Sequence, residues 1–114
     1  MLIVDYMDSV TEYEYQLDTE GRNYIKVMLH YETGLKDVTV IYYTEHRGVR
    51  VPLVTYDTVH RYPHRDIRYL DEHDKKRKKR LDVKSLEEFY RVARENIASN
   101  WRRYLKDFKE MKTG

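Results

Sequence analysis

The stretch VTVIYYTEHRGVRVPLVTY, residues 38–56, consists of two runs of β-branched and aromatic residues separated by the short segment HRG at 46–48. Such runs favour β-strands, because branched and aromatic side chains pack well on a pleated surface. A short connection that contains glycine is typical of a β-hairpin. Pro52 has no amide hydrogen to donate, so we expect its strand to lie at a sheet edge or to be bulged there. The stretch therefore predicts an antiparallel hairpin.

The segments on both sides extend this hairpin into a sheet. Residues 10–17 and 25–31 alternate with a period of two, which predicts a second hairpin earlier in the chain. After a loop at 57–64, residues 65–71 have the composition of another strand, and a basic strand or extension is expected to end near Val83. We therefore expect five or six antiparallel strands between about residues 10 and 83.

The hydrophobic period changes at Ser85, after which apolar residues recur at steps of three and four. Ser85 and Glu88 form a capping-box signature, and lysines cluster near the other end, where the helix dipole favours cations. The pattern predicts one amphipathic helix over about 85–112. The predicted fold class is α+β, with a single domain over residues 1–114 in which this long C-terminal helix packs on the antiparallel sheet.

The length of this helix suggests an interface. At about 1.5 Å per residue, the segment from Leu86 to Met111 spans about 39 Å, more than the width of five strands spaced by about 4.8 Å. Its far end is expected to overhang the sheet and to expose Trp101, Leu105, Phe108 and Met111. A second copy of the chain would cover them, so we expect a homodimer through this helix. The alternative is a helix that lies diagonally across the sheet.

Composition excludes several classes of protein. The chain of 114 residues has room for one modest core. It has no cysteine, which excludes disulfides, thiol nucleophiles and thiolate metal sites. Charged residues make up 37% of it, a usage that resembles hyperthermophile proteins. Because the sequence has neither an apolar run of about 18 residues nor a leader pattern, we expect a cytoplasmic protein that does not enter a membrane.

Charge is distributed unevenly along the chain. Residues 1–46 hold nine acids and three bases, whereas residues 47–114 hold eleven acids and nineteen bases. A basic half favours a polyanion or an acidic partner, although an acidic half of the same fold can also lie beside it. The run KKRKKR at 75–80 is the strongest basic feature. It is either a solvated edge strand or turn, or a clamp for several phosphates that binds without reading bases.

The segment TYDTVHRYPHRDIRY, residues 55–69, carries the residues best suited to catalysis. His60 and His64 titrate near neutral pH, so one can accept a proton while the other donates one. Arg61 and Arg65 can neutralise a phosphate, and Asp57 or Asp66 can orient an imidazole. Cleavage of RNA without a metal needs only such groups, because the substrate's own 2′-hydroxyl acts as the nucleophile.

The face on which these residues lie follows from strand geometry. If Ile67 and Tyr69 face the core, then His64, Asp66 and Arg68 share the opposite face. The structural alternative is that Asp57 caps the turn, that Tyr62 and Pro63 keep the chain extended, and that the histidines bond to the backbone.

A metal site is a weaker interpretation of the same loop. Its ligands would be His60, His64 and either Asp57 or Asp66. The spacing His-x3-His suits a metal on a helix, and Pro63 argues against a helix there. We therefore expect neither a metal nor another cofactor.

Two motifs together resemble a known family. YDTVHRYPHRD at 56–66 and ENIASNWRRY at 95–104 resemble a small uncharacterised prokaryotic family with the patterns YDTAHGxPHRH and DIxxNWxxY. That family is similar in turn to the TumE-type toxins of toxin and antitoxin pairs, which share a YDN...HRH pattern before a C-terminal helix. The resemblance covers about residues 24–108. This chain differs at two positions, where Arg61 replaces a glycine and Asp66 replaces a histidine.

The resemblance implies a role for a set of residues in this chain: Tyr56, Asp57, His60, Pro63, His64, Arg65, Asn100 and Trp101. Within this set, we expect Asn100 on the helix to support the histidine loop from behind.

Two functions are compatible with these features. The first is an RNA-directed protein that resembles a toxin, such as a ribonuclease. In it His60 and His64 would be acid and base, assisted by Tyr56, Asp57 and Asp66. Its phosphate-binding residues would be Arg61, Arg65, Arg68, Lys75, Lys76, Arg77, Lys78, Lys79 and Arg80. The second is a non-catalytic module that binds nucleic acid or an acidic antitoxin-like protein, with a structural histidine loop.

Overall fold

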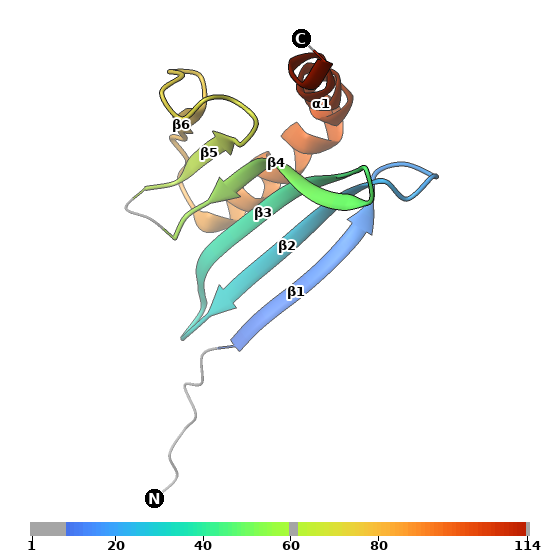
Figure 1. Cartoon of the computed structure of the whole chain (residues 1–114). Coiled ribbons are helices and arrows are strands. Elements are labelled where there is room, and N and C mark those ends of the chain that lie inside the picture. The colour runs from blue at the N-terminus through green and yellow to red at the C-terminus, as the bar shows by residue number, and fades with distance from the viewer. Residues whose placement is uncertain (1–8, 60–61, 114) are drawn as a thin grey trace, which may run out of the picture.

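The computed structural model describes residues 9–59 and 62–113, in which a six-stranded antiparallel sheet packs against one long helix (Figure 1). Each strand pairs with the next one along the chain, so the order of strands in the sheet is the order in the sequence. This arrangement confirms the predicted α+β fold. The elements are β1 (Ser9–Gln16), β2 (Asn23–Tyr31), β3 (Leu35–His46), β4 (Val49–Asp57), β5 (His64–Ile67), β6 (Lys78–Arg80) and α1 (Leu86–Thr113).

The central hairpin of β3 and β4 is the one predicted from residues 38–56. Arg47 and Gly48 connect the two strands with φ angles of 53° and 78°. Positive φ at both central residues gives a two-residue turn whose twist matches that of the flanking strands. The sequence supplies glycine at one of these positions, where such a φ carries no steric cost.

Pro52 lies at a β-bulge in a central strand. Tyr43 pairs with Pro52 whereas Tyr42 pairs with Val54, so Leu53 is the extra residue on β4. On the β5 side, the carbonyl of Leu53 accepts a hydrogen bond from the amide of Arg68 at 2.8 Å, which continues the register of β4 with β5. Because β4 lies between β3 and β5, the bulge that we predicted at Pro52 is confirmed and the edge-strand alternative is wrong.

The strand predicted over residues 65–71 is shorter than expected. β5 ends at Ile67, and the chain then forms a series of turns before β6 begins at Lys78. A side-chain clamp holds this loop, because Arg77 pairs through Nε with Asp66 at 2.8 Å and donates a second bond to the carbonyl of Leu70 at 2.9 Å. The loop at 68–77 is therefore a defined structure that stands beside the helix.

The start of α1 has the predicted cap. The Ser85 hydroxyl accepts a hydrogen bond from the amide of Glu88 at 3.0 Å. The Glu88 carboxylate accepts from the amide of Lys84 at 2.9 Å, one residue before the position that a capping box would use. Ser85 thus satisfies one of the backbone donors that the helix leaves free, and Glu88 fixes the residue that precedes the cap.

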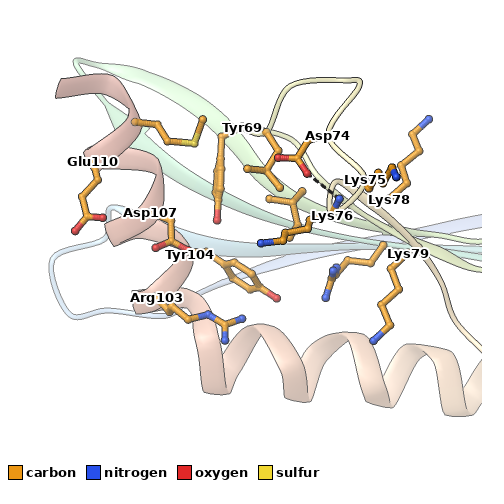
Figure 2. Close-up of a pocket in the computed structure, with 14 residues that line it drawn as sticks. Tyr69, Asp74, Lys75, Lys76, Lys78, Lys79, Arg103, Tyr104, Asp107 and Glu110 are labelled. Atoms are coloured by element: carbon orange, nitrogen blue, oxygen red, sulfur yellow. Dashed lines mark hydrogen bonds between the residues drawn. The ribbon is translucent and has the colours of Figure 1, made fainter. Parts of the chain in front are cut away.

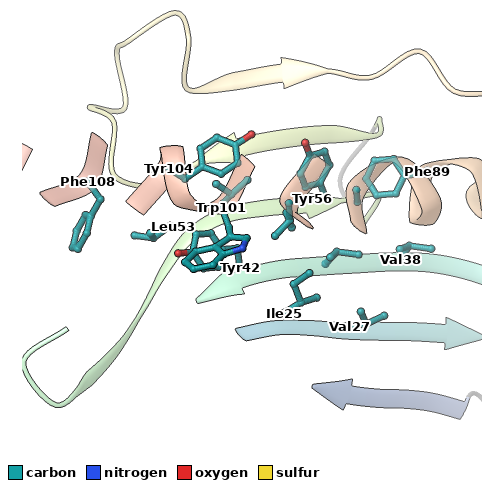
Figure 3. Packing of buried hydrophobic residues seen from close by; sticks show 14 residues of the cluster. Ile25, Val27, Val38, Tyr42, Leu53, Tyr56, Phe89, Trp101, Tyr104 and Phe108 are labelled. Atoms are coloured by element: carbon teal, nitrogen blue, oxygen red, sulfur yellow. The ribbon is translucent and has the colours of Figure 1, made fainter. Parts of the chain in front are cut away.

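The core lies between the sheet and α1. Figure 3 shows Ile25, Val38 and Tyr42 pointing from the strands toward the helix, where Phe89 and Trp101 meet them. The helix lies mainly over β3 and, to a lesser extent, β4. The opposite face of the sheet has no helix on it in the described part of the chain (Figure 1).

The second half of α1 does not overhang the sheet as predicted. Trp101 and Phe108 are only 7% and 2% exposed, because Trp101 packs on Tyr42 and Phe108 packs against Tyr69 and His46. Met111, which was also expected to be exposed, is 52% exposed. The predicted exposure of Trp101 and Phe108 is therefore wrong. The homodimer stays a prediction, without the exposed helix surface on which it was based.

A change of direction in α1 keeps its end on the molecule. Figure 1 shows that the dark-red end of the helix turns away from the line of its orange first half. In this helix the side-chain amide of Asn100 donates to the carbonyl of Asn96 at 2.9 Å. Such a bond competes with the backbone ladder and bends helices.

Among the residues that the structure describes, no helix is both long enough and apolar enough to cross a membrane.

Candidate nucleic-acid interface

A groove of about 940 Å³ lies between the β5–β6 segment and the second half of α1 (Figure 2). One wall is the loop at 68–77 with the ends of β5 and β6, and the other wall is the helix from Arg103 to Met111. The groove exists because the Asp66–Arg77 clamp holds the loop upright and because α1 bends toward it. Its cations come from both walls: Arg65, Lys75, Lys76, Lys78, Lys79 and Arg103.

These six cations form no ion pair within residues 9–59 and 62–112. Three carboxylates, Asp74, Asp107 and Glu110, also line the groove. Two of them have other partners, because Asp74 accepts a bond from the amide of Lys76 and Glu110 lies 3.9 Å from the ammonium of Lys106. The groove is therefore electropositive.

Apolar and aromatic side chains add a second chemical character to the groove. Ile67, Tyr69, Leu70, Tyr104 and Met111 line it together with the cations. Tyr69 stacks on Phe108 with the ring centroids 6.1 Å apart. Burial, with a smaller contribution from the negative charge of Asp107, raises the pKa of Tyr69 to about 12, so its hydroxyl stays neutral at physiological pH.

Behind the groove, a buried hydrogen-bond network joins β4 to α1. The hydroxyls of Tyr56 and Tyr104 both donate to the side-chain oxygen of Asn96, at 2.6 and 2.7 Å. Burial raises the pKa of Tyr56, and the neighbouring guanidinium of Arg65 offsets only part of that effect. The Nε of Arg65 is itself buried, and it has no hydrogen-bond partner in the described part of the structure.

His64 lies on the other side of the sheet edge. Strand register places His64 opposite Asp57 on β4 and opposite Arg80 on β6, on the face away from α1. The Nδ1 atom of His64 is 3.1 Å from the carbonyl of Tyr62. His60 and Arg61, which we predicted as a catalytic residue and a phosphate ligand, lie outside the described residues.

The predicted carboxylates have structural partners. Asp57 accepts bonds from the amide of Val59 at 2.7 Å and from the hydroxyl of Thr39 at 3.3 Å, which is the turn cap of the structural alternative. Asp66 is paired with Arg77. Tyr56 is 2% exposed and its hydroxyl points toward the helix.

Apart from Arg61, the predicted phosphate ligands separate into two groups. Arg65, Lys75, Lys76, Lys78 and Lys79 line the groove. The others have partners elsewhere: Arg77 holds the loop, Arg68 lies 3.4 Å from the hydroxyl of Thr55, and the Arg80 guanidinium lies 5.1 Å over the ring of Tyr62.

The predicted supporting residues are placed as follows. The Pro63 carbonyl accepts a bond from the amide of Leu81 at 2.9 Å, which ties the loop to the end of β6. Trp101 is in the core, and Asn100 bonds within its own helix. The helix asparagine that reaches β4 is Asn96, one turn earlier.

Sequence reasoning missed four residues of this region: Tyr69, Asn96, Arg103 and Tyr104. Helical periodicity could have predicted part of this arrangement, since Asn96 and Tyr104 are eight residues apart and so lie on the same face of the helix. The path of the loop at 68–77, which brings Tyr69 to the helix, has no such local signature.

Among the described residues, no group of three or more potential metal ligands is close enough together to hold an ion. His60 lies outside them, so the three-ligand site weighed from the sequence is not tested.

Comparison with known proteins assigns the chain to a family without supplying an activity. Residues 7–114 match the family model described as a domain of unknown function, DUF7718. No curated protein and no solved structure matches the chain.

Proposed function

The chain belongs to the DUF7718 family, and we propose that it binds single-stranded RNA in the groove between the β5–β6 segment and α1. The observation that carries the proposal is the concentration of six cations around an aromatic groove that contains only three carboxylates. The proposal retains the RNA-directed role expected from the sequence and moves it from the histidines to this groove.

The charge of the groove favours a polyanion. Cations that are close together and lack anionic partners repel one another, and a phosphate chain relieves this repulsion while it releases its own counterions. Lys75, Lys76, Lys78 and Lys79 are all exposed, so their ammonium groups can follow a flexible backbone. Binding of this kind is strongly salt-dependent and largely independent of base sequence.

The size and lining of the groove favour a single strand over a duplex. A volume of about 940 Å³ lies within the range of small-molecule sites, about 300–1,000 Å³, and admits nucleotide units but not a double helix. Tyr69 and Tyr104 provide aromatic surface next to the cations, and proteins that bind single strands combine these two features. We choose RNA over DNA because the loop motif resembles that of TumE-type toxins.

Fluorescence anisotropy with a labelled single-stranded RNA, titrated at several NaCl concentrations, tests the proposal. The variant Lys76→Gln with Lys79→Gln removes two groove cations, and Lys36→Gln with Arg91→Gln is a control of equal charge on surfaces that do not line the groove. We expect the slope of log Kd against log salt to fall by roughly 1.4 in the groove variant, about 0.7 for each phosphate contact. Equal slopes in both variants would exclude the groove.

The same binding experiment is repeated with two other ligands, a duplex RNA and a polyglutamate peptide. A duplex RNA is expected to bind more weakly than the single strand. An acidic antitoxin-like protein is the alternative occupant of a basic groove, and a preference for a polyglutamate peptide over RNA at equal ionic strength would favour it.

A ribonuclease is a second candidate, favoured by the alignment of Asp57, His64 and Arg80 across three adjacent strands. An imidazole between a carboxylate and a guanidinium suits proton transfer at a phosphodiester. RNA cleavage in the presence of a chelator, repeated with His60→Ala and His64→Ala, tests this candidate. Cleavage at the wild-type rate in both variants would contradict the two-histidine mechanism.

A further inference from the structure

Arg65 differs from the other cations of the groove, because its Nε is buried and lacks a hydrogen-bond partner in the described part of the chain. Strand register places Tyr56 of β4 on one side of it and Lys79 of β6 on the other. We infer that Arg65 is the anchor of a subsite for one phosphate at the inner side of the groove. This inference rests on the proposed function, since it names the contact that fixes the strand there.

The position of Arg65 is unfavourable without a ligand. Residues directly opposite each other on paired strands have neighbouring side chains, and like charges in that position repel. Arg65 and Lys79 are such a pair, and the groove adds the guanidinium of Arg103. A buried donor that has lost its water without gaining an acceptor adds a further cost.

The residues around Arg65 do not supply the missing negative charge. Its neighbours Tyr56 and Tyr104 are phenols that donate their hydroxyl protons to Asn96. Because burial raises the pKa of Tyr56, this phenol remains neutral over the whole physiological pH range. No carboxylate of the described residues forms an ion pair with Arg65. Since none of the described residues supplies a compensating anion, we infer that a bound ligand supplies it.

A phosphate fits this requirement better than a carboxylate side chain of a partner. The guanidinium fork presents several donors in one plane, a geometry that matches two oxygens of a phosphate. Lys79 and Arg103 belong to opposite walls of the groove and supply two further cations, and the Arg103 guanidinium lies 5.2 Å over the ring of Tyr104 (Figure 2). Three cations that converge from two strands and a helix can surround one tetrahedral anion.

The test uses a variant that separates binding from stability. Arg65→Met keeps the unbranched apolar stem and removes both the charge and the buried donor. In low-salt buffer without phosphate, we expect the melting temperature of this variant to be equal to or above that of the wild type. Inorganic phosphate should raise the melting temperature of the wild type more than chloride does at equal ionic strength, and this preference should disappear in the variant.

Two more variants control the result. Arg102→Met removes a neighbouring helix cation that does not line the groove, and its response to phosphate should equal that of the wild type. Arg65→Lys keeps the charge but not the fork, and it should lose most of the preference for phosphate even if the methionine variant fails to fold. Affinity for single-stranded RNA should fall about tenfold in Arg65→Met and remain unchanged in Arg102→Met.

The outcomes distinguish this inference from the proposed function. Salt-dependent RNA binding that needs Lys76 and Lys79 but is unaffected by Arg65→Met would overturn the subsite and leave the groove proposal standing. A lower melting temperature of Arg65→Met, combined with an unchanged response to phosphate, would also overturn it. Loss of the phosphate response in Arg65→Met, in a protein that binds no RNA, would support the subsite and reject RNA as its ligand.

Discussion

At the scale of single residues, the position of two buried tyrosines at the groove depends on an uncharged residue, Asn96. Asn96 accepts hydrogen bonds from Tyr56 on β4 and from Tyr104 on α1, and thereby fixes the two phenols beside Arg65. Its replacement leaves two buried hydroxyl groups without an acceptor. The loss of a buried partner costs more than the hydrogen bond itself contributes, because the remaining group has no water to bind.

We therefore predict that Asn96→Ala lowers the free energy of unfolding by about 2–4 kcal/mol, measured by urea denaturation. Asn100→Ala is the matched control, because within the described residues its side-chain amide bonds to a carbonyl of its own helix, and alanine is the better helix former. The control should change the free energy by less than about 1 kcal/mol. Equal effects of the two substitutions would contradict the role assigned to the network.

The buried tyrosines predict a loss of stability at alkaline pH. Burial raises the pKa of Tyr42, Tyr56 and Tyr69 above the usual value of 10.0. The unfolded chain releases these protons near pH 10, whereas the folded chain retains them to higher pH. Stability from this source is thus complete below pH 10 and is lost as pH rises above it, by up to about 1.4 kcal/mol per pH unit for each tyrosine.

Urea denaturation at several pH values between 9 and 11 measures this slope. Tyr56→Phe removes one of the titrating groups, so its slope above pH 10 should be smaller than that of the wild type by about one proton. A wild-type stability that is constant over this range would show that the tyrosines ionise equally in both states.

At the scale of secondary-structure elements, the helix and the hairpins follow local rules while the groove does not. Three features were predictable because each depends on residues close together in the sequence. They are the apolar stripe of α1, the Ser85 cap and the strand hairpins between residues 10 and 57. The turns at 68–77 depend on the Asp66–Arg77 pair, which joins β5 to the last residue of the loop. The bend of α1 accompanies a side-chain bond, and helical periodicity does not reveal it.

The cap of α1 gives a direct test of these local rules. Ser85→Ala removes the acceptor for the amide of Glu88 and is expected to lower the free energy of unfolding by about 1 kcal/mol. Ser99→Ala changes an exposed serine in the middle of the same helix and should have an effect near zero. Thermal melts followed by circular dichroism compare the two variants. An equal loss in both would mean that Ser85 does not act as a cap.

At the scale of the whole molecule, the basic groove and the histidine His64 lie on opposite faces of the sheet. The helix and the β5–β6 segment enclose the groove on one side of the sheet, and His64 lies with Asp57 and Arg80 on the other. His64 on β5 and Arg80 at the end of the basic run on β6 are paired neighbours in the sheet. The sequence also predicted that His64 and Asp66 share the face opposite Ile67, which agrees with the strand register. It did not reveal that Arg65, on the same face as Ile67, lines a groove formed with α1.

The central claim is that RNA occupies the groove, and a titration of the 15N-labelled protein with a short single-stranded RNA tests it most directly. Amide shifts in heteronuclear NMR spectra report which residues meet the ligand. We predict that the largest changes occur at residues 75–79 and 103–107, with smaller ones at Arg65 and Tyr69. Changes confined to β1, β2 and the open face of the sheet, or to the histidine loop alone, would contradict the claim.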